Sequence, residues 1–162
     1  MSCVRSAVWG LVTVVGLCGC SSSSDHQATQ SGISSDPTCG GRAEAVSAGL
    51  SQVSADGYVF ALTALEPAEP VQSAGPPGNT WTISVTDPNG MPASGGALIV
   101  TSYMPDHGHS GPPAVAVEHA DGVYEVDGLV LPMPALYAIT PTLTLPSGTK
   151  ESVVISLCMS SS

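Results

Sequence analysis

The sequence predicts an all-β domain over residues 39–162, an antiparallel sandwich of about seven strands. Two observations support this prediction. Short runs in which apolar and polar residues alternate are separated by turns rich in Gly, Pro, Asn and Asp, which is the pattern of a β-sandwich. Helix signals are few, because only residues 42–53 place apolar side chains at helical spacing, enough for a turn or two of helix.

The strand candidates follow one another at regular spacing along the domain. The clearest spans residues 79–87, where Trp81, Ile83 and Val85 alternate with Thr and Ser and therefore share one face. The other candidates span residues 58–65, 97–103, 114–119, 123–127, 136–145 and 152–158. Seven strands in about 120 residues suit an immunoglobulin-like sandwich.

Three of the connections have turn chemistry. The Asp-Pro-Asn-Gly sequence at 87–90 joins a Pro that presets φ to an Asn-Gly pair that tolerates positive φ. The Asp-Gly pair at 121–122 predicts a hairpin, and Pro-Ser-Gly at 146–148 predicts the last turn. Residues 66–77 are rich in Pro and acidic side chains, and we expect a loop there.

The first 19 residues have the features of a secretory leader. Arg5 supplies the positive charge, and the apolar run at 7–17 is too short to span a bilayer. The run ends in Leu-Cys-Gly-Cys at 17–20, which resembles a bacterial lipobox, and the resemblance implies cleavage before Cys20 and lipid on that residue. Ordinary cleavage without lipid, or a retained membrane anchor, are the alternatives.

Residues 20–38 predict a disordered, Ser-rich tether that follows the lipidated Cys20. Such a segment has a typical reach of roughly 20–25 Å. Several acyl chains hold a protein stably on a membrane without spanning it. We therefore expect an exported protein, lipid-anchored at the periplasmic face of the cell envelope. The residue after Cys20 is Ser21 and not Asp. This resembles the pattern of lipoproteins sorted to the outer membrane in Gram-negative bacteria.

Charge and composition exclude several classes of function. The mature chain keeps two basic residues, Arg42 and Lys150, against 13 acidic ones, a formal charge of −11. This balance argues against nucleic acid, whose affinity for proteins depends on Lys and Arg, and against electrostatic docking on anionic lipid. The sequence has no Ser-His-Asp order, carboxylate pair, nucleotide-binding loop or redox Cys-x-x-Cys, so we expect no enzymatic activity.

Two cysteines remain in the domain, Cys39 near its start and Cys158 near its end. Only one pairing is possible, and outside the cytoplasm the two should form a disulfide. The alternative is that Cys158 and its neighbour Met159 ligate a metal, which would leave Cys39 unpaired.

The segment 104–110 (Met-Pro-Asp-His-Gly-His-Ser) has the chemistry of a candidate site. His107 and His109 are two residues apart and point to one side of an extended segment. Together with Met104 and the Met-Pro at Met133, two imidazoles and two thioethers could converge, which is a ligand set suited to Cu(I). Asp106 could replace a Met for a harder metal. The alternative is that the histidines are solvated and the methionines pack.

Four ordered motifs in the domain resemble the YtkA-like (FixH-related) family. They are Asn-Thr-Trp at 79–81, Met-Pro-Asp-His-Gly-His at 104–109, Asp-Gly-Val-Tyr at 121–124 and Met-Pro-Ala-Leu-Tyr at 133–137, within a match over about residues 57–157. The chain departs from the family pattern at Ser110 and Ala135, where Gly is usual, at Tyr137, where Trp is usual, and in having Pro132 before the Met.

The resemblance implies an immunoglobulin-like fold and an exported or membrane-anchored protein. Some members of the family are linked to copper handling and respiratory-oxidase assembly. Carried over to this chain, the motifs imply a copper site at Met104, His107, His109 and Met133, with an envelope copper or respiratory protein as partner. The competing hypothesis is a structural or protein-interaction sandwich without metal, in which these loops serve packing.

Overall fold

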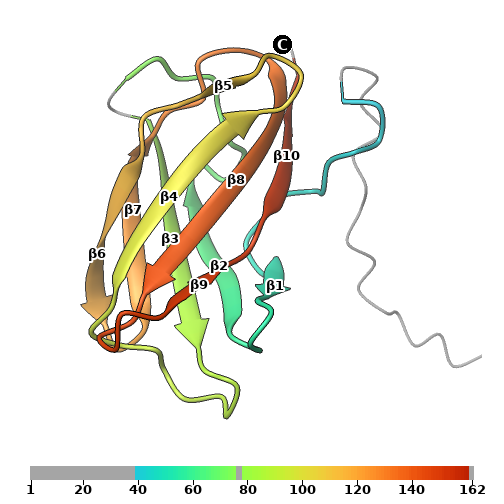
Figure 1. Cartoon of the computed structure of the whole chain (residues 1–162). Helices are drawn as coiled ribbons and strands as arrows, with labels where there is room; N and C mark the ends of the chain where they lie inside the picture. Colours follow the sequence, from blue (N-terminus) through green and yellow to red (C-terminus); the bar gives the residue numbers. More distant parts are fainter. Residues whose placement is uncertain (1–38, 76–77, 161–162) are drawn as a thin grey trace, which may run out of the picture. The chain divides into compact units, whose positions relative to one another are not determined.

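The computed structural model describes residues 39–75 and 78–160, and all regular elements among them are strands (Figure 1). The signal peptide, the lipidated Cys20 and the tether predicted for residues 1–38 lie outside the described residues. Within the described ranges, no helix has the length and apolar character needed to cross a membrane.

Ten strands make up the described part of the domain. They are β1 (Ser51–Val53), β2 (Val59–Glu66), β3 (Asn79–Thr86), β4 (Ala97–Met104), β5 (His109–Ser110), β6 (Ala114–Ala120), β7 (Val123–Leu129), β8 (Ala135–Thr144), β9 (Lys150–Ser152) and β10 (Ile155–Met159).

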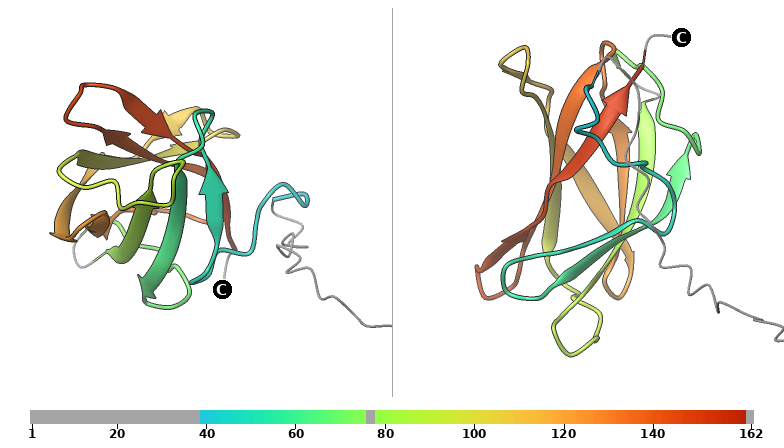
Figure 2. Two further views of the ribbon diagram at one scale, coloured as in Figure 1. Left: turned by 90° about the horizontal axis from the view of Figure 1, so that it is seen from below. Right: turned by 90° about the vertical axis from the view of Figure 1, so that its right-hand side faces the viewer.

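The strands form one curled antiparallel sheet in the order β1-β2-β3-β7-β6-β4-β8-β10, with β5 beside β4 and β9 beside β8. Its two halves face each other, as the views in Figure 2 show. The halves meet where β6, paired with β7 along most of its length, also pairs with β4 through Ile99↔Val115 and Val100↔Ala114. This architecture confirms the predicted all-β antiparallel sandwich.

The core lies between the two halves and follows from alternation along the strands. Trp81, Ile83 and Val85 on β3 are all buried, as their spacing predicts. On β4, Leu98 and Val100 point inward and their neighbours point outward. Other large, fully buried side chains come from both halves: Phe60, Leu62, Tyr124, Leu129, Leu131, Tyr137, Ile139, Leu143 and Ile155.

The helix expected within residues 42–53 is wrong. The chain there runs along the sheet instead: Glu44 bridges to Leu157, its N–H donates to the Ser156 carbonyl at 2.7 Å, and β1 follows. Gly49, with a φ of 96°, would interrupt a helix in any case. Pairing with the sheet satisfies the backbone groups that a helix would have satisfied internally, and it overrides a weak helical spacing.

The strand expected over residues 152–158 is interrupted. Residues 153–154 leave the ladder between β9 and β10, although Val153, Ile155 and Leu157 still face the core together.

The predicted turns are present at all three places. Gly122 in the β6–β7 turn has a φ of 68°, and a Cβ there would lie 2.7 Å from the Val85 carbonyl oxygen, so only Gly fits.

The turn after β3 depends on a carboxylate, and this gives a pH prediction. Asp87 Oδ1 accepts the N–H groups of Met91 and Asn89, each at 2.8 Å, and these bonds, Met91's foremost, lower the pKa of Asp87 below 3.8. A lowered pKa means that the ionised carboxylate stabilises the fold above about pH 4 and that this contribution is lost as pH falls through the lowered value. An NMR titration of the Asp87 carboxyl carbon should show the lowered pKa in the folded chain. The isolated peptide 84–93 should titrate at the ordinary value, and identical titrations would contradict the prediction.

Candidate functional site

The segment that follows β4 forms a tight, exposed hairpin loop. The carbonyl oxygen of Met104 accepts the N–H groups of His107 at 3.2 Å and Gly108 at 2.9 Å. Gly108 has a φ of 70°, the left-handed conformation that lets the chain turn back. The returning β5 pairs with the end of β4, and residues 105–110 are all exposed.

The loop places two imidazoles side by side in solvent. The ring centroids of His107 and His109 lie 6.1 Å apart, with an angle of 26° between their planes. Two imidazoles that ligate one ion through bonds of about 2.0 Å have centroids roughly 5–6 Å apart. The centroid separation of the stacked His107 and His109 rings is thus at the upper end of the range for two imidazoles on a shared ion.

Met104 does not share the exposure of the histidines. It ends the inward-facing series of β4 and belongs to the main hydrophobic core, with 3% of its surface exposed. In this arrangement the Met104 thioether packs against apolar neighbours and does not reach the solvent-facing imidazoles.

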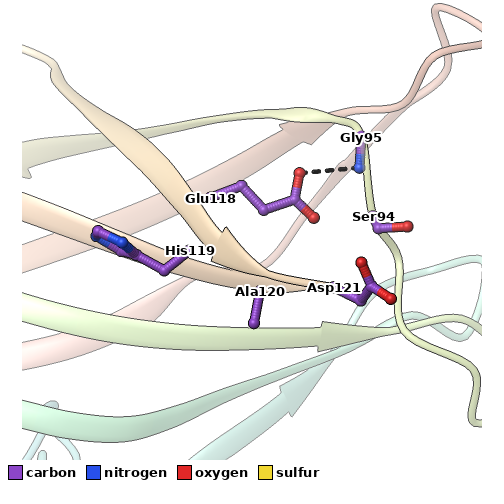
Figure 3. Close-up of a pocket in the computed structure, with 6 residues that line it drawn as sticks. All are labelled: Ser94, Gly95, Glu118, His119, Ala120 and Asp121. Carbon is purple, nitrogen blue, oxygen red and sulfur yellow. Dashed lines mark hydrogen bonds between the residues drawn. The ribbon is translucent and has the colours of Figure 1, made fainter.

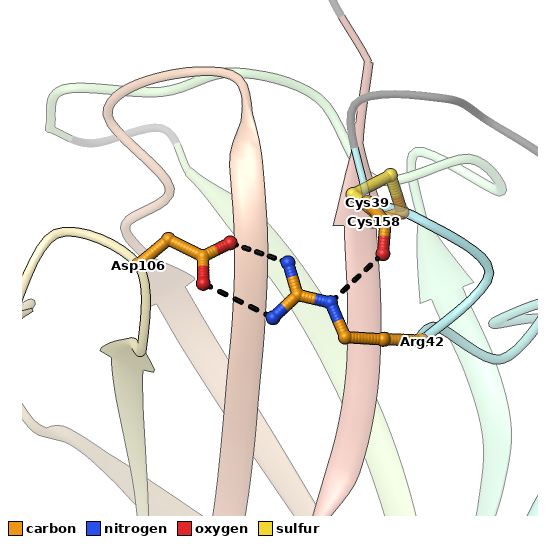
Figure 4. Close-up of a disulfide and its surroundings, with 4 residues drawn as sticks. All are labelled: Cys39, Arg42, Asp106 and Cys158. Carbon is orange, nitrogen blue, oxygen red and sulfur yellow. Dashed lines mark hydrogen bonds and ion pairs between the residues drawn. A yellow bond between two sulfur atoms is a disulfide. The ribbon is translucent and has the colours of Figure 1, made fainter.

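Asp106 is held by a cation from a distant part of the chain. The Arg42 guanidinium donates to both carboxylate oxygens of Asp106, at 3.0 and 2.5 Å (Figure 4). The hydrogen bond from Arg42 lowers the pKa of Asp106, and the same contact raises the pKa of Arg42. Both oxygens thus point toward Arg42, and Asp106 is not directed at the histidines for a shared metal.

Sequence reasoning did not single out Arg42 as part of this loop. The two residues are 64 positions apart, and no local pattern links them. The available signal was compositional, since Arg42 is one of only two basic residues after position 19, against 13 acidic ones.

The contact between Arg42 and Asp106 is supported by the disulfide. Cys39 and Cys158 are bonded, with their Cα atoms 5.9 Å apart, which confirms the pairing predicted from the cysteine count. Arg42 Nε donates to the carbonyl oxygen of Cys39 at 3.1 Å. Because Cys158 is disulfide-bonded, it offers no thiolate to a metal in this structure.

The second Met-Pro loop lies at the same end of the domain as the histidine loop (Figure 1). The Tyr137 hydroxyl donates to the Met133 carbonyl at 2.8 Å and accepts the Met133 N–H at 3.3 Å. Gln72 Nε2 donates to the carbonyl oxygen of Pro132 at 2.8 Å. These bonds fix the backbone and leave the Met133 residue 37% exposed. Tyr137 is buried, and burial raises its pKa.

A separate surface hollow lies at the opposite end of the sheet, where β6 ends (Figure 3). Its main carboxylate, Glu118, accepts the N–H groups of Gly95 at 2.9 Å and Gly122 at 3.0 Å, so it ties two loops together. His119, beside it, points outward and lies 3.3 Å from Glu125 across the β6–β7 pair. Over residues 39–75 and 78–160, no three His, Cys, Asp or Glu side chains converge to hold a metal ion.

Comparison with known proteins gives one match. The model of the YtkA-like family matches residues 53–142, more than half of the chain, and the matched span includes both the histidine loop and the Met133 loop. No curated protein and no solved structure matches.

Proposed function

The chain belongs to the YtkA-like family, and on that basis we propose that it is an exported, lipid-anchored β-sandwich module that binds copper in the cell envelope. The observation that supports this proposal is the His107–His109 pair, exposed at the tip of a fixed hairpin loop with its rings 6.1 Å apart. Both imidazoles are exposed to solvent on neighbouring positions of one loop, so their nitrogens are accessible to a metal ion.

The ligands proposed are the imidazoles of His107 and His109, joined by the thioether of Met133 from the neighbouring loop. Imidazole with thioether is a soft set, so it favours Cu(I) over Cu(II) and over hard cations. Met104, a ligand in the family pattern, would join this set only if it left the core, where it is 3% exposed. We therefore assign Met104 to packing beneath the loop.

The proposed anchor and tether would determine where the module lies relative to the membrane. Lipid on Cys20 would hold the chain at a membrane, and residues 21–38 would let the domain move roughly 20–25 Å from it. Such an arrangement suits a module that passes copper to an envelope copper or respiratory protein within reach of the membrane.

The proposal predicts a specific loss of copper binding. A lipid-free chain that begins at Ser21 should bind one Cu(I) in competition with a chromogenic chelator. The double variant His107→Ala/His109→Ala should lose this binding, because the loop then retains no imidazole. His119→Ala is the matched control: it removes an exposed histidine from β6 and should bind as the parent does.

Two further variants assign the methionines. Met133→Ala should weaken Cu(I) binding, whereas Met104→Leu, a swap of similar volume in the core, should leave it unchanged. Equal, weak Cu(I) binding by the parent and by the double histidine variant would contradict the copper proposal.

A second function is favoured by the burial of Met104. If the loops serve packing, the domain is a structural or protein-interaction module, and the bonds between Tyr137 and Met133 would serve to hold that end of the sandwich in shape. The copper assay separates the two functions, because a packing module has no reason to bind Cu(I) through His107 and His109.

A further inference from the structure

We propose that Arg42 is a positioning residue for the histidine loop and that, by holding Asp106, it biases the site toward Cu(I) and against harder ions. The inference rests on the proposed copper function for its ligand, and on the Arg42–Asp106 contact for its geometry. Arg42 touches neither histidine in the structure; it acts through Asp106, the residue immediately before His107.

The loop needs an external support because burial does not supply one. Residues 105–110 are exposed, and within this hairpin their backbone support is the two bonds to the Met104 carbonyl and the short β4–β5 pairing. Exposed loops with few contacts open easily. The fork of Arg42 adds two parallel, charge-assisted hydrogen bonds, a geometry that fixes orientation as well as distance.

Arg42 is itself held on a rigid base. Its Nε donates to the carbonyl oxygen of Cys39, a residue with no exposed surface that is covalently bonded to Cys158 on β10 (Figure 4). Cys158 pairs with Leu136 of β8, and β8 pairs in turn with β4, which carries the loop. The loop is thus connected to the sheet at both of its ends and, through Arg42, at its middle.

The contact also decides which ligands the loop offers. Two imidazoles with a carboxylate immediately before the first of them in sequence form a donor set suited to Zn(II), which accepts oxygen as well as nitrogen. While Arg42 occupies both oxygens of Asp106, the carboxylate is withdrawn, and imidazole nitrogen with thioether sulfur remains, which suits Cu(I). Without Arg42, Asp106 would be a free oxygen ligand one residue from His107.

The test uses the variant Arg42→Gln in the exported chain, with Lys150→Gln as control. The control removes the other basic residue of the mature chain and changes the net charge by the same amount, from β9. Arg42→Gln should weaken Cu(I) binding by up to about tenfold, the lower end of the effect of losing a group bonded directly to a metal ligand, because Arg42 acts through Asp106. It should strengthen Zn(II) binding by a similar factor. Lys150→Gln should change neither.

The double variant Arg42→Gln/Asp106→Asn isolates the role of the carboxylate. It should lose the gain in Zn(II) affinity and keep the weakened Cu(I) binding, because the loop is unsupported and has no oxygen ligand. A purely structural role for Arg42 would weaken both metals together. An unchanged ratio of Zn(II) to Cu(I) affinity in Arg42→Gln overturns the proposal.

Hydrogen exchange in the metal-free chain separates this inference from the copper function. The amides of His107 and Gly108 should exchange faster in Arg42→Gln than in the parent, while the amides of the β4–β8 ladder keep their protection. If the parent binds no Cu(I) but these amides and the Zn(II) affinity respond as expected, the copper function and the bias toward Cu(I) fail, while the roles of Arg42 in positioning the loop and in withdrawing Asp106 stand. Unchanged exchange at both amides overturns the positioning role.

Discussion

Replacement of both disulfide cysteines, Cys39→Ser/Cys158→Ser, is expected to lower the free energy of unfolding by about 4–5 kcal/mol. The bond joins residues 119 positions apart, and the chain-entropy model gives a larger stabilisation for a longer closed loop. A domain of this size has a total stability of about 5–15 kcal/mol, so the variant should be partly unfolded at physiological temperature. Urea denaturation of the parent and the variant, followed by tryptophan fluorescence, measures the difference.

A control for this prediction uses the parent chain itself. Addition of a dithiol reductant before denaturation should reproduce the stability of the double-serine variant, because both remove the same bond. A loss of less than about 1 kcal/mol in both experiments would contradict the entropic argument and would mean that the unfolded chain is already compact.

The substitution Trp81→Ala is expected to cost about 3–5 kcal/mol, the second large effect. Trp81 is the third residue of β3, has no exposed surface, and is the largest of the fully buried side chains. The chain has a single Phe, and aromatic residues make up 4% of it, so few other large side chains could fill the resulting cavity. A fall in the urea midpoint with an unchanged slope would show that stability, and not the two-state character, has changed.

Trp81→Phe is the matched variant for this position. The indole Nε1 of Trp81 is buried without a hydrogen-bond partner, and an unpaired buried donor costs about 1–3 kcal/mol. Phe removes that donor while keeping most of the apolar volume, so its net cost should be about 2 kcal/mol or less. Equal losses for Ala and Phe would contradict the cavity explanation.

The sandwich could be predicted because its strands alternate cleanly and its turns have specific chemistry. On β3 every second residue is apolar, and Asp-Pro-Asn-Gly stops the strand where the structure ends it. The predictions failed where pairing between distant parts of the chain determined the local structure. Residues 42–53 have an apolar spacing compatible with a helix, but the carbonyl oxygens of Ser156 and Leu62 accept the N–H groups of Glu44 and Gly49.

The candidate site shows the same difference between features set by local sequence and features set by long-range contacts. A spacing of two residues suggests that His107 and His109 lie close together, but their rings approach through a turn at residues 105–108, with Gly108 at a φ of 70°, and not through the extended segment that the sequence predicts. The burial of Met104 also follows from local alternation, since it continues the inward series Leu98, Val100 of β4 beyond the point where the sequence suggested a loop. The contact between Arg42 and Asp106 follows from neither, because it depends on where the disulfide places the first described residues of the domain.

The disulfide also determines how the domain would carry a mechanical load. The chain enters the domain at Cys39, and a pull on the residues before it would pass directly through the sulfur–sulfur bond into β10. From there, the five register pairs between β10 and β8 would share the force. The segment after Cys39, which includes Arg42, lies outside this line of tension. A pull from the proposed anchor at Cys20 would therefore bypass Arg42 and its contact with Asp106.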